Sequence, residues 1–162
     1  MNMREHFGAF YRELIADEEL LRLLYYPPTV VPGDSPLNPS KSNVLSMDNK
    51  WEIIKDKIKG APKTDDLTVQ KNSRVFLYLG ERRNTQNYLV SSQEIIFDIL
   101  INMDWEDADQ RSLWVNDRRN EILIHQNISG IGKVEFKKAG QIRAPEGFVG
   151  YRLVYEIGSA KR

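Results

Sequence analysis

The segment YLVSSQEIIFDILINM, from Tyr88 to Met103, has the clearest strand pattern in this 162-residue chain. Apolar side chains alternate with other residues along it, which is the period of a β-strand with one buried face. The residues on the apolar face are Leu89, Ile95, Phe97, Ile99, Ile101 and Met103. A long strand of this kind is stable only within a larger sheet, so the flanking sequence is expected to supply further strands.

Three other segments carry the same alternation. They are residues 73–80, 133–143 and 148–157. Between the two resulting hairpins, a helix is expected from a cap at Asp109 to about Gln126. Two hairpins around a helix predict an α+β fold, with an antiparallel sheet of about four main strands and helices packed on one face.

A single domain is expected over residues 1–162. In its N-terminal half the sequence predicts helices and a long arm. Apolar residues at helical spacing predict a helix over residues 3–25, with a break or a second start at the motif ADEE. Residues 27–47 include five of the seven prolines and no periodic pattern, so they predict an extended arm. A further helix is expected over residues 48–58. The residues of its apolar face and its candidate caps are Trp51, Ile54, Ile58, Ser46 and Asp48.

The composition restricts the classes of function. The chain has 23 Lys and Arg against 23 Asp and Glu, so its formal net charge is zero, whereas a stand-alone DNA-binding protein usually has a basic excess. It has no cysteine, which excludes disulfides, thiolate nucleophiles and cysteine metal sites. No stretch resembles a signal peptide or the roughly 20 apolar residues of a membrane helix, so synthesis in a cytoplasm without membrane association is expected.

Asp98, Glu135 and Lys137 form the strongest catalytic pattern. An Asp on one strand and Glu-x-Lys on another can hold magnesium and position an attacking water, as in a nuclease. However, 36 residues separate Asp98 from Glu135, and such common residues often match by chance. We therefore favour a structural role, in which Glu135 and Lys137 pair across strands and Asp98 has a polar or arginine partner in its own or a neighbouring subunit.

The remaining polar motifs also favour structural roles. His6 and His125, the two histidines, are expected at a helix end or on the surface, although sequence alone leaves a spatial triad open. The motif GIGK (residues 130–133) lacks the full pattern of a phosphate-binding loop and favours a turn into a strand. The motif GERRN places Arg82 and Arg83 at a hairpin tip, where they can contact phosphate, pair with a neighbouring subunit or stay in solvent.

The helix DQRSLWVNDRRNEILIHQ has apolar residues on several sides. Leu113 and Ile124 point in one direction, Val115 and Ile122 in a second, and Trp114 in a third. A helix of this type is often buried on more than one side. In a chain of this length, a neighbouring subunit can cover the extra side.

The order of these elements carries a resemblance. It rests on RVFLYLGERRNTQN, QEIIFDILINM, the helix with DQR near its start, GIGKVEF and RAPEGFVGYRLVYEI, which together span about Ser73 to Gly158. This part of the chain resembles the tail terminator proteins of long-tailed bacteriophages, also called tail completion or head–tail joining proteins. No catalytic motif contributes to the resemblance, and the proline-rich arm lies outside it.

The resemblance implies a structural, non-enzymatic virion protein of the phage tail or neck, made in the host bacterial cytoplasm and needing no cofactor or metal. Such proteins form six-fold rings that cap the tail tube, stop its growth and dock to the head connector, while genome DNA passes through the channel without sequence-specific binding. A head-completion or stopper protein of the neck is the alternative of the same kind. The residues expected at subunit or partner interfaces are Val30, Val31, Leu37, Arg82, Arg83, Trp114 and Arg118.

Overall fold

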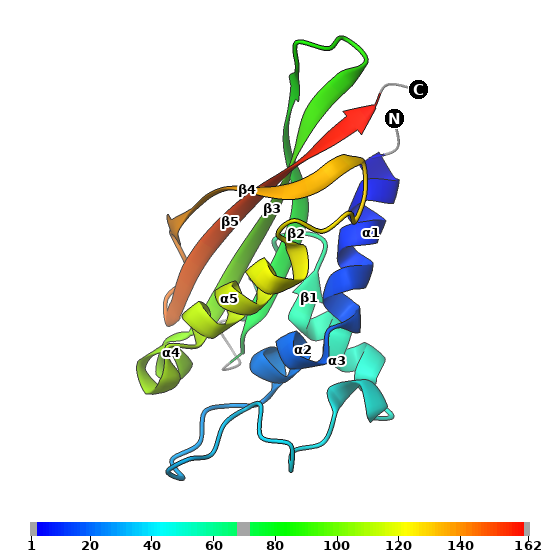
Figure 1. The fold of residues 1–162 in the computed structure, drawn as a ribbon. Helices are drawn as coiled ribbons and strands as arrows, with labels where there is room; N and C mark the ends of the chain where they lie inside the picture. The colour runs from blue at the N-terminus through cyan, green and yellow to red at the C-terminus, as the bar shows by residue number, and fades with distance from the viewer. Residues whose placement is uncertain (1–2, 68–71, 161–162) are drawn as a thin grey trace.

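The fold is α+β, as the sequence predicts. The computed structural model describes residues 3–67 and 72–160. None of the helices in these two ranges combines the length and apolar composition needed to cross a bilayer. The elements in chain order are α1 (Met3–Ala16), α2 (Glu18–Tyr25), the 3-10 helix η1 (Val44–Ser46), α3 (Lys50–Lys57), β1 (Ile58–Lys59), β2 (Arg74–Asn84), β3 (Val90–Asn102), α4 (Met103–Asp109), α5 (Arg111–Leu123), β4 (Ile131–Ile142) and β5 (Phe148–Ala160) (Figure 1).

β3, the strand within the opening stretch, is the centre of a five-stranded sheet. The strand order is β1-β2-β3-β5-β4. β3 pairs antiparallel with β2 on one side and with β5 on the other, and β4 pairs antiparallel with β5. β1 adds two residues parallel to the start of β2. The sheet is therefore mixed, and it has one short strand more than the four main strands predicted.

The helices cover one face of this sheet (Figure 1). The alternation in β3 decides which face that is, because Phe97, Ile99 and Ile101 point into the main hydrophobic cluster and are fully buried. Burying each such side chain stabilises the fold by about 1.5–3 kcal/mol. At the two ends of the predicted apolar face, Leu89 and Met103 lie outside β3 and are exposed.

The opposite face of the sheet is different in character. Among the described residues, it has no helical cover, and a small apolar cluster of Leu67, Phe76, Leu100 and Phe148 lies there. Charged side chains from β3, β4 and β5 occupy another part of this face. The sheet thus has one face committed to the core and one face that carries paired charges.

The predicted N-terminal helix is divided in two at Asp17. The Asp17 side chain accepts a hydrogen bond from the backbone N–H of Leu20 (2.8 Å) and so caps α2. In α3 the predicted apolar face is wrong at one position, because Ile53 and Ile54 are buried whereas Trp51 is exposed. The N-cap position of α3 belongs to neither predicted residue, and the residue there makes no side-chain cap bond.

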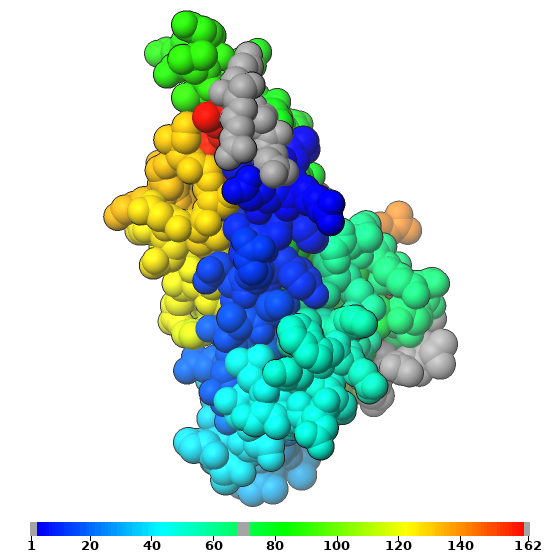
Figure 2. Space-filling model, turned by 90° about the vertical axis from the view of Figure 1, so that its right-hand side faces the viewer, coloured from blue at the N-terminus to red at the C-terminus, as the bar shows by residue number. Residues whose placement is uncertain are grey.

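Residues 27–43 form a loop without helix or strand. Three turns shape it, closed by backbone hydrogen bonds from Asp34, Asn38 and Lys41. Arg22 of α2 donates to the carbonyl oxygen of Asn38 (3.0 Å), which holds part of the loop against α2. The loop lies at one end of an elongated molecule and the tip of the β2–β3 hairpin lies at the other (Figures 1 and 2).

Two boundaries in the second half differ from the prediction. β2 extends to Asn84, so Arg82 and Arg83 lie within the strand, opposite Gln93 and Ser92, and not at the hairpin tip. Asp109 is the last residue of α4 and does not cap the following helix. α4 was not predicted. For its residues the sequence indicated the end of a strand followed by a connection.

The motif GIGK is a turn into a strand, as predicted. Gly130 and Gly132 both have positive φ angles, +82° and +80°. A Cβ atom on Gly130 would lie 2.1 Å from the carbonyl oxygen of Gly158, whereas one on Gly132 would meet no atom within 4 Å. The backbones of the turn and of β5 therefore approach each other closely at Gly130.

Gly130→Ala is consequently expected to lower the free energy of unfolding by about 3 kcal/mol, and Gly132→Ala by only about 1 kcal/mol. Both changes strain a left-handed backbone position, but the first also forces a collision with β5. Urea unfolding of the two variants measures the difference. Equal losses would show that β5 yields to the added methyl group.

Candidate functional site

Asp98 lies on the sheet face opposite the helices and is held by two protein side chains. Arg152, its register partner on β5, donates from Nε to Oδ1 (2.6 Å) and from Nη2 to Oδ2 (2.7 Å). The hydroxyl of Tyr78 donates to Oδ2 (2.5 Å). Burial, together with the bond to Asp98, raises the pKa of Tyr78 to about 12. The expected arginine partner of Asp98 is thus confirmed, and it comes from the same chain.

Glu135 and Lys137 lie two strands away from Asp98. Glu135 is opposite Glu156 of β5, which is opposite Glu94 of β3. The Lys137 ammonium hydrogen-bonds to Glu156 and lies 3.5 Å from a carboxylate oxygen of Glu94. The bond to Glu156 is the main cause that raises the pKa of Lys137 above its ordinary value. The predicted cross-strand pairing is confirmed for Lys137 but is wrong for Glu135, because the register sets Glu135 opposite another carboxylate.

The structure does not bring the three predicted nuclease residues together. Asp98 aligns with Arg152 and Gly140, whereas Glu135 aligns with Glu156, with β5 between the two carboxylates. Within residues 3–67 and 72–160, no three His, Asp or Glu side chains are grouped so that they could hold a metal ion. The carboxylate of Asp98 is instead occupied by Arg152 and Tyr78.

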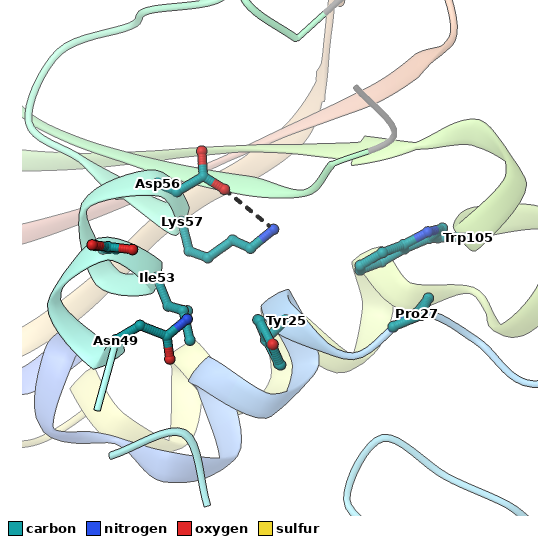
Figure 3. A pocket seen from close by; sticks show the side chains of 8 residues that line it. Tyr25, Pro27, Asn49, Ile53, Asp56, Lys57 and Trp105 are labelled. Atoms are coloured by element: carbon teal, nitrogen blue, oxygen red, sulfur yellow. Dashed lines mark ion pairs between the residues drawn. The ribbon is translucent and has the colours of Figure 1, made fainter. Parts of the chain in front are cut away.

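A pocket of about 530 Å³ lies between α2, α3 and α4 (Figure 3). Tyr25, Pro27 and Trp105 form one side, and Asp56 and Lys57 of α3 form another. Burial lowers the pKa of the Lys57 ammonium, although the Asp56 carboxylate opposes this. The pocket therefore combines aromatic walls with an ion pair between a buried lysine and a partly exposed aspartate.

The charges in this pocket are satisfied by their own neighbours. Lys57 hydrogen-bonds to Asn72 and lies 3.5 Å from the Asp56 carboxylate. Asp56 also accepts from Arg74 (2.6 Å), which is 2% exposed and bound to Asp66 as well. This network ties α3 and the segment before β2 to the sheet, so we assign it a structural role.

Three of the predicted interface residues meet at one groove, which we call the α5 groove. Leu37 comes from the loop after α2, and Trp114 and Arg118 come from α5; the groove has a volume of about 240 Å³. Arg118 donates to both carboxylate oxygens of Asp17 (3.0 and 2.7 Å), and it also pairs with Glu121. The sequence placed these residues at an interface, and the structure brings them together.

The other four predicted interface residues lie elsewhere. Val30 is 100% exposed and Val31 is 61% exposed. Arg82 donates to the hydroxyl of buried Ser159 (3.1 Å), and Arg83 pairs with Glu81 on the surface. Arg82 therefore joins β2 to β5 within the chain, whereas the two valines are exposed.

His6 is buried near the start of α1 and not on the surface. Its Nδ1 lies 2.6 Å from the hydroxyl of Ser129 and its Nε2 lies 2.9 Å from that of Ser159. The imidazole ring joins α1 to the start and the end of the second hairpin, and no local sequence pattern predicts these contacts. His125 lies just beyond the end of α5, where it was expected, and has a positive φ of 61°.

The stability of the fold should depend on the charge of His6. Burial, followed by the nearby Arg82 guanidinium, lowers the pKa of His6 below its ordinary value of 6.5. As pH falls below that value, the unfolded chain takes up a proton that the folded chain resists, so stability is lost. Thermal unfolding of wild type and His6→Gln between about pH 8 and pH 5 should show a flatter profile for the variant. Parallel profiles would contradict this role of His6.

Three arginines are almost fully buried, which was not expected from the sequence: Arg74, Arg111 and Arg119. Arg111 donates to the carboxylate of Asp109 (2.6 Å) and to the carbonyl oxygens of Leu23 (2.6 Å) and Tyr26 (2.7 Å). It thereby satisfies carbonyl groups at the end of α2 and fixes α5 beside it. Arginine is mostly exposed in folded proteins, so composition and periodicity give no signal for such residues.

Comparison with known proteins places the chain in a family. The family model described as YomW matches residues 17–157. This chain belongs to the YomW family. The matched range begins at the cap of α2 and ends in β5, so it includes both the α5 groove and nearly the whole sheet.

A YomW family relative is similar along its full length. The chain is 31% identical over 169 aligned residues to the SPbeta prophage-derived uncharacterized protein YomW of Bacillus subtilis (strain 168), with 97% of each protein covered. The family thus includes a prophage-derived protein. A prophage origin agrees with the resemblance to phage proteins that the sequence shows. It does not specify a place in the virion.

Proposed function

We propose that this YomW family member is a structural phage protein that forms a hexameric ring at the top of the tail tube. There it ends tube growth and joins the tail to the head connector or stopper protein, in the tail and neck of the virion. The observation that carries the proposal is the full-length similarity to a prophage-derived protein. The resemblance of residues 73–158 to tail terminators supplies the finer role.

The difference between the two faces of the sheet supports the proposal of a ring around a channel. Helices lie on one face, and the other face carries acidic and basic side chains that pair with one another, as in the Asp98–Arg152 and Glu156–Lys137 pairs. Proteins that bind DNA tightly present an excess of basic groups to phosphates. A face without a basic excess, turned toward a channel, would instead let genome DNA pass without sequence-specific binding.

The exposed apolar side chains support subunit contacts. Trp114 on α5 and Phe136 on β4 are 38% and 46% exposed. They lie on different elements, and a cyclic ring needs two different patches that meet between neighbouring subunits. Each contact is expected to bury about 800 Å² per partner.

Disruption of the gene in the encoding phage tests the proposed function. We expect filled heads separated from tails, and tails of irregular length, when lysates are viewed by electron microscopy. Tails of normal length that fail to join heads would point to a stopper protein of the neck instead. Normal, joined particles would overturn the proposal.

The loop carrying Val30 and Val31 is expected to contact a partner. Since both side chains are exposed, the double change Val30→Ser and Val31→Ser should alter the free energy of unfolding by less than about 0.5 kcal/mol. Infectious particles complemented with this variant should decrease about tenfold or more, as for loss of an apolar contact. The matched control is Thr29→Ser, beside them on the same exposed loop. An unchanged yield for the double variant would remove the loop from the interface.

A further inference from the structure

The charges of this neutral chain are separated between two surfaces. Residues 103–126, which include α4 and α5, contain six acidic residues and three arginines, and two of those arginines are fully buried. Residues 131–143, which include β4, contain four basic residues and one acidic residue. A molecule with zero net charge therefore has one surface rich in acids and another rich in bases.

The α5 groove belongs to the acidic surface, since Glu19, Asp117 and Glu121 line it, and it is also apolar. Trp114 and Leu37 line the groove, and Leu113, next to Trp114 in the sequence, is 51% exposed. Arg118, the one basic side chain that lines it among the described residues, is already bound to Asp17 and pairs with Glu121. The exposed carboxylate of Asp117 is therefore not neutralised by Arg118, and the groove favours a partner with basic and apolar groups.

The basic surface is the β4 edge, by which we mean the exposed side chains Ile131, Lys133, Phe136 and Lys138. β4 is the last strand of the sheet and pairs with β5 alone among the described strands. Ile131 and Phe136 are 48% and 46% exposed. Lys137 is engaged with Glu156 and Glu94, whereas Lys133 and Lys138 extend from an exposed strand.

We infer that the α5 groove of one subunit receives the β4 edge of a second copy of this chain. Exposed apolar side chains are present on both surfaces, and the charges of the two surfaces are opposite. Electrostatic complementarity of this kind selects the partner and fixes its register. In Figure 1, β4 borders the sheet while α5 crosses the helical layer, so the contact joins two different patches.

This contact specifies the subunit interface of the ring and rests on the function proposed above. A contact between unlike patches leaves each subunit with one free patch of each kind, so further copies add until a ring closes. A second copy is a better occupant than an unrelated basic protein, because both complementary surfaces are present on one chain. The experiment therefore asks whether two copies meet at these two surfaces.

The absence of cysteine allows a direct test by cross-linking. Asp117→Cys protein is mixed with Lys138→Cys protein, and a short bis-maleimide reagent joins thiols that lie close together. At about 1 mM total protein, a contact with a Kd of that order is substantially populated. The mixture should yield about ten times more cross-linked dimer than a control mixture of Asp117→Cys with Lys55→Cys, an exposed position on α3. Equal yields would overturn the contact.

Charge reversal gives a second readout with the same cysteine pair. Lys133→Glu, placed in the Lys138→Cys protein, should reduce the cross-link about threefold or more, and added salt should reduce the wild-type cross-link. In the Asp117→Cys protein, position 117 carries the thiol, so the acidic charge is reversed at Glu121 instead. Mixing Asp117→Cys protein that carries Glu121→Lys with Lys138→Cys protein that carries Lys133→Glu should restore the yield of cross-linked dimer. If neither charge reversal changed the yield of cross-linked dimer, the two thiols would be meeting without the proposed charge complementarity.

The outcome for the contact is distinct from that for the proposed function. A specific cross-link in a protein that is absent from virions would retain the contact and reject the tail role. A ring on the tail tube without the Asp117–Lys138 cross-link would retain the tail role and reject the contact.

Discussion

Replacing Arg111 with methionine is expected to lower the free energy of unfolding by about 3–5 kcal/mol. The Arg111 side chain is fully buried and packs over the Trp105 ring at 5.0 Å. Its loss leaves the carbonyl oxygens of Leu23 and Tyr26 without the hydrogen bonds that it donates, and leaves Asp109 without its cation. Arg111→Lys should recover only a part, because an ammonium lacks the guanidinium's fork of donors. Chemical denaturation of the three proteins measures the effect.

Arg119→Met is the matched control for this prediction. Arg119 is also fully buried and lies over the Phe97 ring, but among the described residues it makes one hydrogen bond, to Asn116, and its Nε and Nη1 have no partner there. Burial lowers the pKa of Arg119 to about 10. Removing a poorly satisfied buried charge is expected to leave stability unchanged or raise it by up to about 2 kcal/mol. Equal losses at positions 111 and 119 would mean that volume, and not hydrogen bonding, decides both.

Trp114→Glu is expected to abolish assembly while leaving the subunit folded. Trp114 is 38% exposed on α5, so the change should cost less than about 1 kcal/mol of stability. At the contact it removes an aromatic anchor and puts in its place a carboxylate that loses its hydration when the partner covers it. Loss of such an anchor typically weakens a contact by 2 kcal/mol or more, which is about 30-fold. The yield of infectious particles from a complemented gene-deficient phage is the measurement.

Trp51→Glu provides the control for Trp114→Glu. Trp51 is 56% exposed on α3, outside the α5 groove and the β4 edge. It should support particle formation at nearly the wild-type level. Equal defects for the two variants would indicate a general sensitivity to surface aromatic residues. A normal yield for Trp114→Glu would remove α5 from the interface.

The strands could be predicted because a single physical rule governs them. One face of β3, β2 and β5 is buried against helices, so apolar residues recur at every second position. The same rule separates Asp98 from Phe97 and Ile99 and makes a charged partner on a neighbouring strand necessary. The partner's identity, Arg152, depends on the register of β3 with β5, which alternation alone does not determine.

The helical connections were predicted less well, for a different reason. α4 contains mainly acidic residues, and its signals are local: the Asn102 side chain caps it, and Asp104 and Glu106 lie in its first turn. Those capping signals were present in the sequence and could have identified it. The contact of Arg82 could not be predicted in this way, because its bond to Ser159 joins residues 77 positions apart and leaves no local pattern in the sequence.

Among the predicted interface residues too, a local sequence pattern identifies single residues but not which of them meet in the fold. Trp114 was identified because it lies off the apolar stripe of its helix, and such a residue is either exposed or covered by a partner. The meeting of Trp114 with Leu37 at one groove requires the packing of α2 on α5 and could not be derived from spacing. The acidic character of this groove likewise depends on which carboxylates Arg118 neutralises.

The most direct test of the central claim is a cryo-electron microscopy map of the neck of the phage that encodes this chain. We expect six copies in one ring on the last ring of the tail tube, with the helix-free face of the sheet toward the channel. We also expect α5 of each copy to lie against β4 of the next. A map that places the chain away from the junction between head and tail, or shows none of it in the particle, would rule out the proposed role.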